Sequence, residues 1–328
     1  MAMPFLDPDQ ALLDARFPLP LDAPFTGTMA RAAGLHSVEL TSLVRRGLVR
    51  RLIGNVYVVA QVPDSMELRL AGLRLVVPER AVVTDRTAGW LHGATMVLAP
   101  GDHLILPRVS AFHRGRGLRL RNELVSSGQR MMPDEHVMEI GGIRVTTPLR
   151  TACDLGRLLR RDSAFAALDA MLRLGAFDQE ELLEAIACFK GYRGVRQLRW
   201  MAPLSDPRAE SPPESILRLR WLDCVRLPRP LPQRPVRAPH WVPGGTYWID
   251  LGVDELRFGV EYDGKDFHGV DRTDHDVRRR RWITEEEGWT LCVVRKENLF
   301  GRRADVDDIL HAGVVEARRR LGRPGAFI

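Results

Sequence analysis

The sequence predicts a protein of the α/β class, α+β overall. A helix-turn-helix unit with a hairpin should come first, then a helical middle region, then a unit that mixes strands with helices. Three observations support this: capped helical patterns recur between residues 25 and 200, strand-like runs group near both ends, and 328 residues suffice for two or three domains. No apolar run approaches the roughly 20 residues of a membrane helix, so no membrane partner is expected.

Charge and cysteine content indicate the compartment and a class of partner. The net charge of +6 favours a polyanionic partner such as DNA. The four cysteines are widely spaced and lack a CxxC pair, which is typical of a reducing compartment. Because the start of the sequence lacks the pattern of a secretory signal, we expect a cytoplasmic, nucleoid-associated protein.

Composition divides the chain into five segments. Residues 1–24 are rich in proline and are expected to form an N-terminal arm. Residues 201–213 combine Pro, Ser and Asp and are expected to form a linker. The folded units are expected over residues 25–60, 61–200 and 214–328.

The segment 25–60 carries the pattern of a winged helix-turn-helix. Ser37 is a preferred N-cap residue, and Gly47 lies where a helix end favours a left-handed residue. The expected elements are helices over 25–33 and 37–46 and strands over 48–53 and 56–59, joined at Gly54 and Asn55.

Basic and polar side chains dominate this unit. Residues 26–60 contain five arginines and one acid, Glu39, a local balance of +4. A recognition helix contacts base edges while neighbouring basic groups hold phosphates. The alternative is a small helical cap with a solvated arginine face. The candidate DNA-binding residues are Thr41, Ser42, Arg45 and Arg46 on the second helix and Arg50, Arg51 and Asn55 on the hairpin.

The middle segment shows no pattern that requires catalysis. Its histidines, among them His92, His103 and His113, lack the spacing of metal ligands. Helices are expected over 67–77, 85–93, 164–174 and 179–189 and from Pro148 onward, with strands over 103–107 and 118–121.

The C-terminal segment alternates strands with helices. We expect helices over 214–224, 271–287 and 305–321, and strands over 233–236, 247–253, 258–262 and 290–295.

Two of these strands carry carboxylates. If 247–253 and 258–262 form a hairpin that turns near residue 255, Asp250 lies opposite Glu261, with Cβ atoms about 5 Å apart. Asp263 follows on the same face of its strand. Ile249, Leu251, Phe258, Val260 and Tyr262 are expected to form the apolar face.

Three neighbouring carboxylates repel one another unless a cation neutralises them. Mg²⁺ or Mn²⁺ accepts such oxygen ligands, so Asp250, Glu261 and Asp263 are candidate metal ligands. Lys265 can hold a phosphate or the attacking water, and His268 has a pKa suited to general acid-base work. The alternative is an exposed hairpin with solvated acids. The arginines at 278–281, with Arg279 and Arg280 as candidates, either follow a DNA backbone or form a solvated face.

Residues 210–300 resemble the DUF559 domain, which is similar to the very-short-patch-repair endonucleases of the PD-(D/E)XK superfamily. The resemblance is carried by Glu214-Ser215, Ile249-Asp250-Leu251, Val260-Glu261-Tyr262-Asp263-Gly264, His268 and the Asp276–Arg280 helix. It implies a mixed central sheet flanked by helices. It also implies that Glu214 is the helix acid, Asp250 the central metal ligand, and Glu261 and Asp263 the motif acids. One departure is Asp263, which stands where the superfamily usually has lysine.

Residues 25–190 resemble the AbiEi family of antitoxin-like regulators with an N-terminal winged helix. The motifs that carry this resemblance are Ala32-Ala33-Gly34-Leu35, Leu43–Leu48, Gly54-Asn55-Val56-Tyr57, Ala88–Gly93 and Thr147-Pro148-Leu149-Arg150-Thr151. The main hypothesis is a metal-dependent DNA endonuclease targeted by the winged helix, in repair, restriction or phage defence. The alternatives are a non-enzymatic DNA-binding regulator or antitoxin with a degenerate nuclease domain, and a module that binds a cognate toxin or second subunit.

Overall fold

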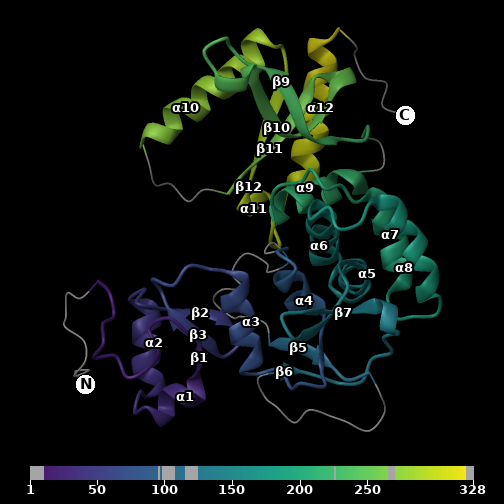
Figure 1. The fold of residues 1–328 in the computed structure, drawn as a ribbon. Helices are drawn as coiled ribbons and strands as arrows, with labels where there is room; N and C mark the ends of the chain where they lie inside the picture. Colours follow the sequence, from purple (N-terminus) through teal and green to yellow (C-terminus); the bar gives the residue numbers. More distant parts are fainter. Residues whose placement is uncertain are drawn as a thin grey trace. The chain divides into compact units, whose positions relative to one another are not determined.

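The computed structural model describes residues 11–94, 97, 108–114, 125–224, 227–264 and 270–322. The chain divides into two compact units, Met1–Leu155 and Gly156–Ile328 (Figure 1). Helices and mixed sheets occur in both, which confirms the predicted α+β class. In the described part of the chain, no helix combines the length and apolar character needed to cross a bilayer.

Unit 1 begins with two short helices and a three-stranded sheet. The sheet order β1-β3-β2 places the strand Phe25–Thr26 beside the hairpin. The predicted helix over 25–33 is therefore wrong at its start, where Thr26 is instead the N-cap and accepts a hydrogen bond from the Met29 amide at 3.1 Å. The elements are β1 (Phe25–Thr26), α1 (Gly27–Ala32), α2 (Ser37–Arg45), β2 (Val49–Ile53) and β3 (Val56–Val59).

The helix α2 begins at Ser37 with His36 as its N-cap, so the predicted cap is displaced by one residue. The His36 amide donates to the Glu39 carboxylate at 2.8 Å, which satisfies an amide that the helix leaves without a partner. Leu40 and Leu43 are buried and pack with Phe25 and Tyr57. This packing fixes which face of α2 points outward.

The rest of unit 1 contains helices and a second sheet. In its described residues the sheet order is β6-β5-β4-β8-β7, with parallel and antiparallel pairs. The sequence did not predict these short strands, and the strands expected over 103–107 and 118–121 lie outside the described residues. The elements are α3 (Met66–Arg74), β4 (Val82–Val83), α4 (Asp85–Leu91), β5 (Val109–Phe112), β6 (Val125–Ser126), β7 (Val137–Ile140), β8 (Ile143–Thr146) and α5 (Pro148–Leu158).

The first helices of unit 2 are joined by a buried ion pair. Asp169 on α6 accepts two hydrogen bonds of 2.7 Å from Arg218 on α9, and both side chains are buried. Removing one partner of such a pair typically costs about 3–5 kcal/mol, because the other charge stays buried. The helices are α6 (Arg161–Arg173), α7 (Gln179–Ala185), α8 (Val195–Met201) and α9 (Pro212–Asp223).

A mixed sheet of order β12-β11-β10-β9 forms the centre of unit 2. The helices α9 and α12 cover one face, and α10 with the following π-helical turn covers the other (Figure 1). The predicted bounds of these strands differ from those observed by at most two residues. The elements are β9 (Leu231–Arg237), β10 (Thr246–Val253), β11 (Phe258–Asp263), α10 (Val270–Arg281), the turn Trp282–Glu286, β12 (Thr290–Arg295), α11 (Lys296–Leu299) and α12 (Val306–Arg320).

The hairpin β10–β11 has the predicted register but differs in its faces. Leu251 pairs with Val260 and Gly252 with Gly259, so Asp250 and Glu261 are the next positions. Ile249 packs with Val236, Ile283 and Trp289, whereas Leu251 packs in the cluster on the opposite face. The prediction that Ile249 and Leu251 share one apolar face is therefore wrong. The alternation breaks at Asp250, whose carboxylate accepts the Tyr262 amide at 2.7 Å.

Candidate functional site

The outward face of α2 is the first candidate site. Thr41, Arg45 and Arg46 are exposed and Ser42 is half-buried. A groove of about 210 Å³ runs between α1, α2 and the hairpin and is lined by residues that include Arg31, Thr41, Arg51 and Asn55. These elements have the helix, turn, helix and wing arrangement in which a second helix enters the major groove of DNA.

The wing residues differ in how exposed their side chains are to a ligand. Arg51 is exposed, with its guanidinium carbon 5.6 Å from the centre of the Tyr57 ring. Arg50 is half-buried and donates to the Val62 carbonyl at 2.9 Å. The Asn55 carbonyl accepts the Gly27 amide at 3.2 Å, which ties the wing to the start of α1. Arg51 is therefore the wing residue best placed to reach a ligand.

The second candidate site is the group of acids in unit 2. Glu214 lies in the first turn of α9 and accepts hydrogen bonds from the Glu210 amide, the Ser211 hydroxyl and the Gln233 side chain. Burial, assisted by the charges of Glu214 and Glu261, raises the pKa of Asp250 to about 7, although the Tyr262 amide and Arg279 act in the opposite direction. The structure therefore brings Glu214, Asp250 and Glu261 into one electrostatic neighbourhood.

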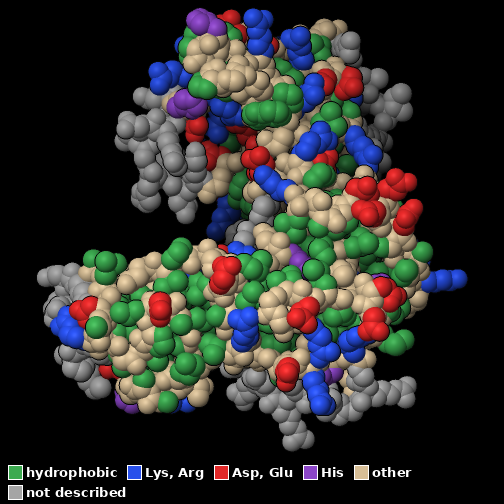
Figure 2. Space-filling view, viewed as in Figure 1, with side chains coloured by type: hydrophobic (Ala, Val, Ile, Leu, Met, Phe, Trp, Pro, Cys, Tyr) green, Lys and Arg blue, Asp and Glu red, His purple; other side chains and the backbone are tan. Residues whose placement is uncertain are grey.

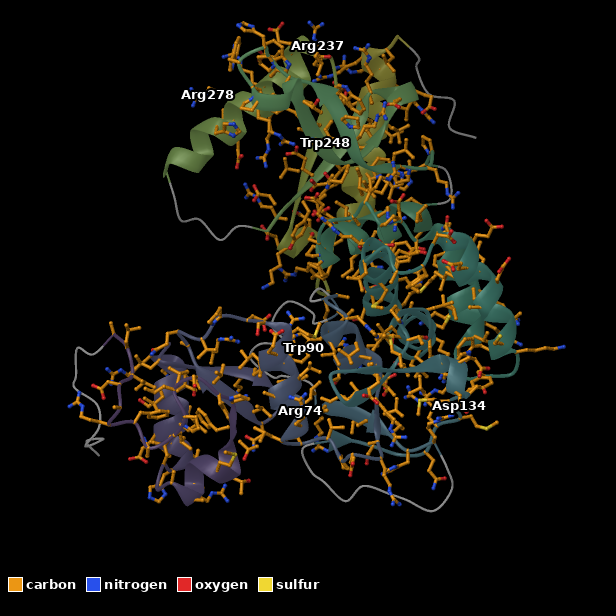
Figure 3. The ribbon with its side chains drawn as sticks, in the orientation of Figure 1. Arg74, Trp90, Asp134, Arg237, Trp248 and Arg278 are labelled. Carbon is orange, nitrogen blue, oxygen red and sulfur yellow. The ribbon has the colours of Figure 1, made fainter. Side chains whose placement is uncertain are left out.

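Two arginines of α10 neutralise this group. Glu261 is 4% exposed, and its Oε1 forms an ion pair with Arg279 Nη1 at 2.5 Å but accepts no hydrogen bond. Its Oε2 accepts a hydrogen bond from Arg280 Nε at 3.0 Å. Arg280 also reaches the Asp263 carboxylate at 3.3 Å. Arg279 donates in addition to the backbone carbonyl of Trp248, a residue labelled in Figure 3. Arg279 and Arg280, for which a DNA backbone or solvent was the expected environment, thus contact carboxylates of the sheet.

In this structure, arginine side chains rather than a cation neutralise the acids. A metal site needs several free carboxylate oxygens around one point. Within the described ranges no group of three His, Cys, Asp or Glu side chains has the spacing to hold an ion, and the oxygens of Glu261 already face guanidinium groups. Lys265 and His268 lie outside the described residues.

Sequence reasoning missed a buried charge network in unit 1. Arg130 pairs with Asp85 at 2.6 Å and with Asp154 at 3.1 Å. Asp154 also pairs with Arg150 at 2.9 Å, and Arg150 contacts His136 Nδ1 at 2.9 Å. Burial and the Arg150 charge lower the pKa of His136. The four-residue spacing of Arg150 and Asp154 on a helix was the one local signal for this network.

The amino-acid sequence is similar to one family model and to two proteins of Mycobacterium tuberculosis. Residues 58–204 match the family model described as the AbiEi antitoxin C-terminal domain. Two uncharacterized proteins of Mycobacterium tuberculosis, from the strains CDC 1551 / Oshkosh and ATCC 25618 / H37Rv, are each 33% identical over 260 residues, which cover 78% of this chain and 89% of the relative. The chain belongs to the family of these two proteins. The residues that match the AbiEi antitoxin C-terminal domain begin within β3 and include the Asp85–Arg130–Asp154–Arg150 network.

Proposed function

We propose that this chain is a DNA-binding transcriptional regulator of the antitoxin type. The observation that carries the proposal is the exposed face of α2, which bears Thr41, Arg45 and Arg46, with Thr41 and the wing residue Arg51 lining one groove. Arginine side chains on such a face donate to phosphates and base edges. The match of the following residues to an antitoxin domain supports the same function.

The distribution of charge agrees with this proposal. Residues 1–155 contain eighteen basic and fifteen acidic residues, a balance of +3, whereas residues 26–60 alone carry +4. The rest of unit 1 is therefore slightly acidic. A local basic surface on a nearly neutral background directs a polyanion to the winged helix.

The direct test is binding of the full chain to a duplex that contains the DNA upstream of its own coding sequence. The double variant Arg45→Ala/Arg46→Ala should bind at least tenfold more weakly in fluorescence anisotropy. The matched control is Arg196→Ala/Arg199→Ala, which removes two exposed arginines from α8 and should bind like the wild type. Equal affinity of both double variants, or absence of wild-type binding to any duplex, would contradict the proposal.

A toxin partner follows from the antitoxin-type proposal. An antitoxin of this type is expected to neutralise the product of a neighbouring gene, either through a complex or through repression. Co-expression of the two gene products followed by size-exclusion chromatography separates these cases. A stable complex would support direct binding, and separate elution with preserved promoter binding would support repression.

We propose metal-dependent cleavage of DNA as a second candidate function. The observation in its favour is the neighbourhood of Glu214 and Glu261 that raises the pKa of Asp250, since clustered acids with shifted pKa values often mark functional sites. The arginines that neutralise Glu261 argue against it. The test is incubation of plasmid and mismatched duplex with the wild type and with Asp250→Ala and Glu261→Ala, in Mg²⁺ or Mn²⁺. Cleavage that both substitutions abolish would support it, and cleavage that neither changes would refute this site.

A further inference from the structure

An apolar residue occupies the outward face of α2. Val38 is 79% exposed, the largest exposed fraction among the large hydrophobic side chains of the described residues. The spacing of Val38, Thr41, Ser42 and Arg45 places them on one face of the helix, because positions i, i+3, i+4 and i+7 are neighbours. The core is served by Leu40 and Leu43 on the opposite face. Packing in unit 1 therefore gives no reason for valine at this position.

Thr41 extends the apolar character of this face. Its hydroxyl donates to the Ser37 carbonyl at 2.8 Å, one turn earlier in the helix. The donor is thereby used within the helix, and the γ-methyl group and one acceptor remain for a ligand. The N-terminal half of the outward face thus offers methyl groups, and the C-terminal half offers the Arg45 guanidinium.

The bases of DNA differ in what they offer to such a surface. In the major groove, thymine alone presents a methyl group, on C5, and apolar side chains contact it. The N-terminal residues of a recognition helix are those that reach the base edges. Val38 is the second residue of α2, so it lies in the part of the helix that approaches the bases most closely.

We propose that Val38 is a specificity-determining residue that selects a thymine through its C5 methyl group, with the Thr41 methyl beside it. The inference rests on the proposed DNA-binding function and deepens it. Arg45, one turn beyond Thr41, supplies affinity through a phosphate or a guanine edge. The preferred sequence therefore contains at least one position at which thymine is favoured over cytosine and over uracil.

The experiment begins with selection of preferred duplexes from a random library by the full chain. Each thymine of the selected duplex is then replaced singly by deoxyuridine, which removes the methyl group and leaves the hydrogen-bonding groups unchanged. Binding is measured by fluorescence anisotropy for the wild type, for Val38→Ala, and for Met66→Ala as a control. Met66 is an exposed apolar residue of α3 and lies outside the proposed contact.

For the wild type and for Met66→Ala, deoxyuridine at one position should weaken binding about fourfold, the factor that corresponds to roughly 0.8 kcal/mol for one buried methyl group. For Val38→Ala the same replacement should change the affinity by less than about twofold. A wild type that binds the duplex tightly but ignores every methyl group overturns the inference and leaves the DNA-binding function intact. A Val38→Ala variant with undiminished sensitivity does the same, whereas loss of all duplex binding by the wild type overturns both.

Discussion

The ionised form of the Asp250 side chain is unfavourable in unit 2. It is half-buried, and desolvation together with the neighbouring charges of Glu214 and Glu261 makes it costly to ionise. The Tyr262 amide and Arg279 offset part of this cost. The balance still leaves its pKa at about 7, well above the ordinary value of 3.8.

Asp250 should therefore make the stability of unit 2 depend on pH. Because its pKa is raised in the folded state, its contribution is fully present below about pH 4 and is lost as pH rises through about 7. The shift corresponds to at most about 4 kcal/mol. Asp250→Asn keeps an oxygen for the Tyr262 amide but cannot ionise, so it should be more stable than the wild type at pH 8 and similar to it at pH 4.

The measurement is urea denaturation of both proteins between pH 4 and pH 8 in EDTA, followed by tryptophan fluorescence. Glu255→Gln is the control, because Glu255 is an exposed acid in the turn of the same hairpin. It should reproduce the pH dependence of the wild type. A constant difference between Asp250→Asn and the wild type at all pH values would show that Asp250 does not titrate in this range.

For single residues, the sequence predicts exposure on a helix better than it predicts the partner of a charged side chain. The exposed arginines of α2 follow from local pattern, because helical spacing decides which side chains point away from Leu40 and Leu43. The partners of Arg279 and Arg280 do not follow, since they depend on where α10 crosses the sheet relative to Glu261 and Asp263. A run of arginines looks the same in the sequence whether it faces solvent or a buried carboxylate.

At the scale of elements, the register of the strands is easier to predict from the sequence than the side of the sheet on which each side chain lies. The register of β10 and β11 follows from the positions of two apolar runs about a short turn, and it is the register observed. The face of Ile249 was mispredicted because strict alternation was assumed across Asp250. The neighbouring strand β9 is irregular opposite Asp250, where Gln233 has a φ of 49°. Such a break depends on hydrogen bonds between strands, which one strand's sequence does not reveal.

The contact between α12 and the sheet depends on the absence of a side chain at Gly313. A Cβ atom at this position would lie 2.5 Å from Phe258 Cζ and 2.9 Å from Cys292 Sγ. Phe258 is fully buried beneath Trp221, with ring centres 5.2 Å apart, so it has little room to move. The glycine therefore lets α12 approach β11 and β12 closely.

Gly313→Ala should destabilise the protein even though alanine favours helices. The gain in helix propensity is about 1 kcal/mol, but overpacking a tight core costs about 1–3 kcal/mol, and the fixed Phe258 ring places this site toward the upper end. We expect a net loss of roughly 1–2 kcal/mol in the free energy of unfolding, measured by urea denaturation. Val315→Ala, a change at an exposed position of α12, should stay within about 0.5 kcal/mol. An increase in stability for Gly313→Ala would mean that α12 can shift without loss.

For the whole molecule, net charge is a poor guide to where a polyanion binds. Each unit carries +3, since residues 156–328 contain thirty basic and twenty-seven acidic residues. Figure 2 shows Lys and Arg side chains distributed over both units on the face that it presents. In unit 2, however, Arg218, Arg279 and Arg280 are committed to carboxylates. In the winged helix, by contrast, Arg31, Arg45, Arg46 and Arg51 are all exposed.

The salt dependence of DNA binding measures the contribution of these exposed arginines. Each arginine-phosphate contact contributes about −0.9 to the slope of log K against log salt concentration. If the four exposed arginines of residues 26–60 each make one contact, the slope for the full chain should be roughly −4. Arg45→Ala/Arg46→Ala should flatten it by about 2. Arg196→Ala/Arg199→Ala should leave it unchanged.

The measurement is the affinity for one duplex at several salt concentrations between about 50 and 200 mM, the range over which counterion release dominates non-specific binding. A wild-type slope much steeper than −5 would exceed what the winged-helix arginines supply and would assign phosphate contacts to other arginines. A slope that Arg45→Ala/Arg46→Ala leaves unchanged would move the binding surface away from α2. The expected slope, and its partial loss in that variant alone, would place the electrostatic contact with DNA within residues 26–60.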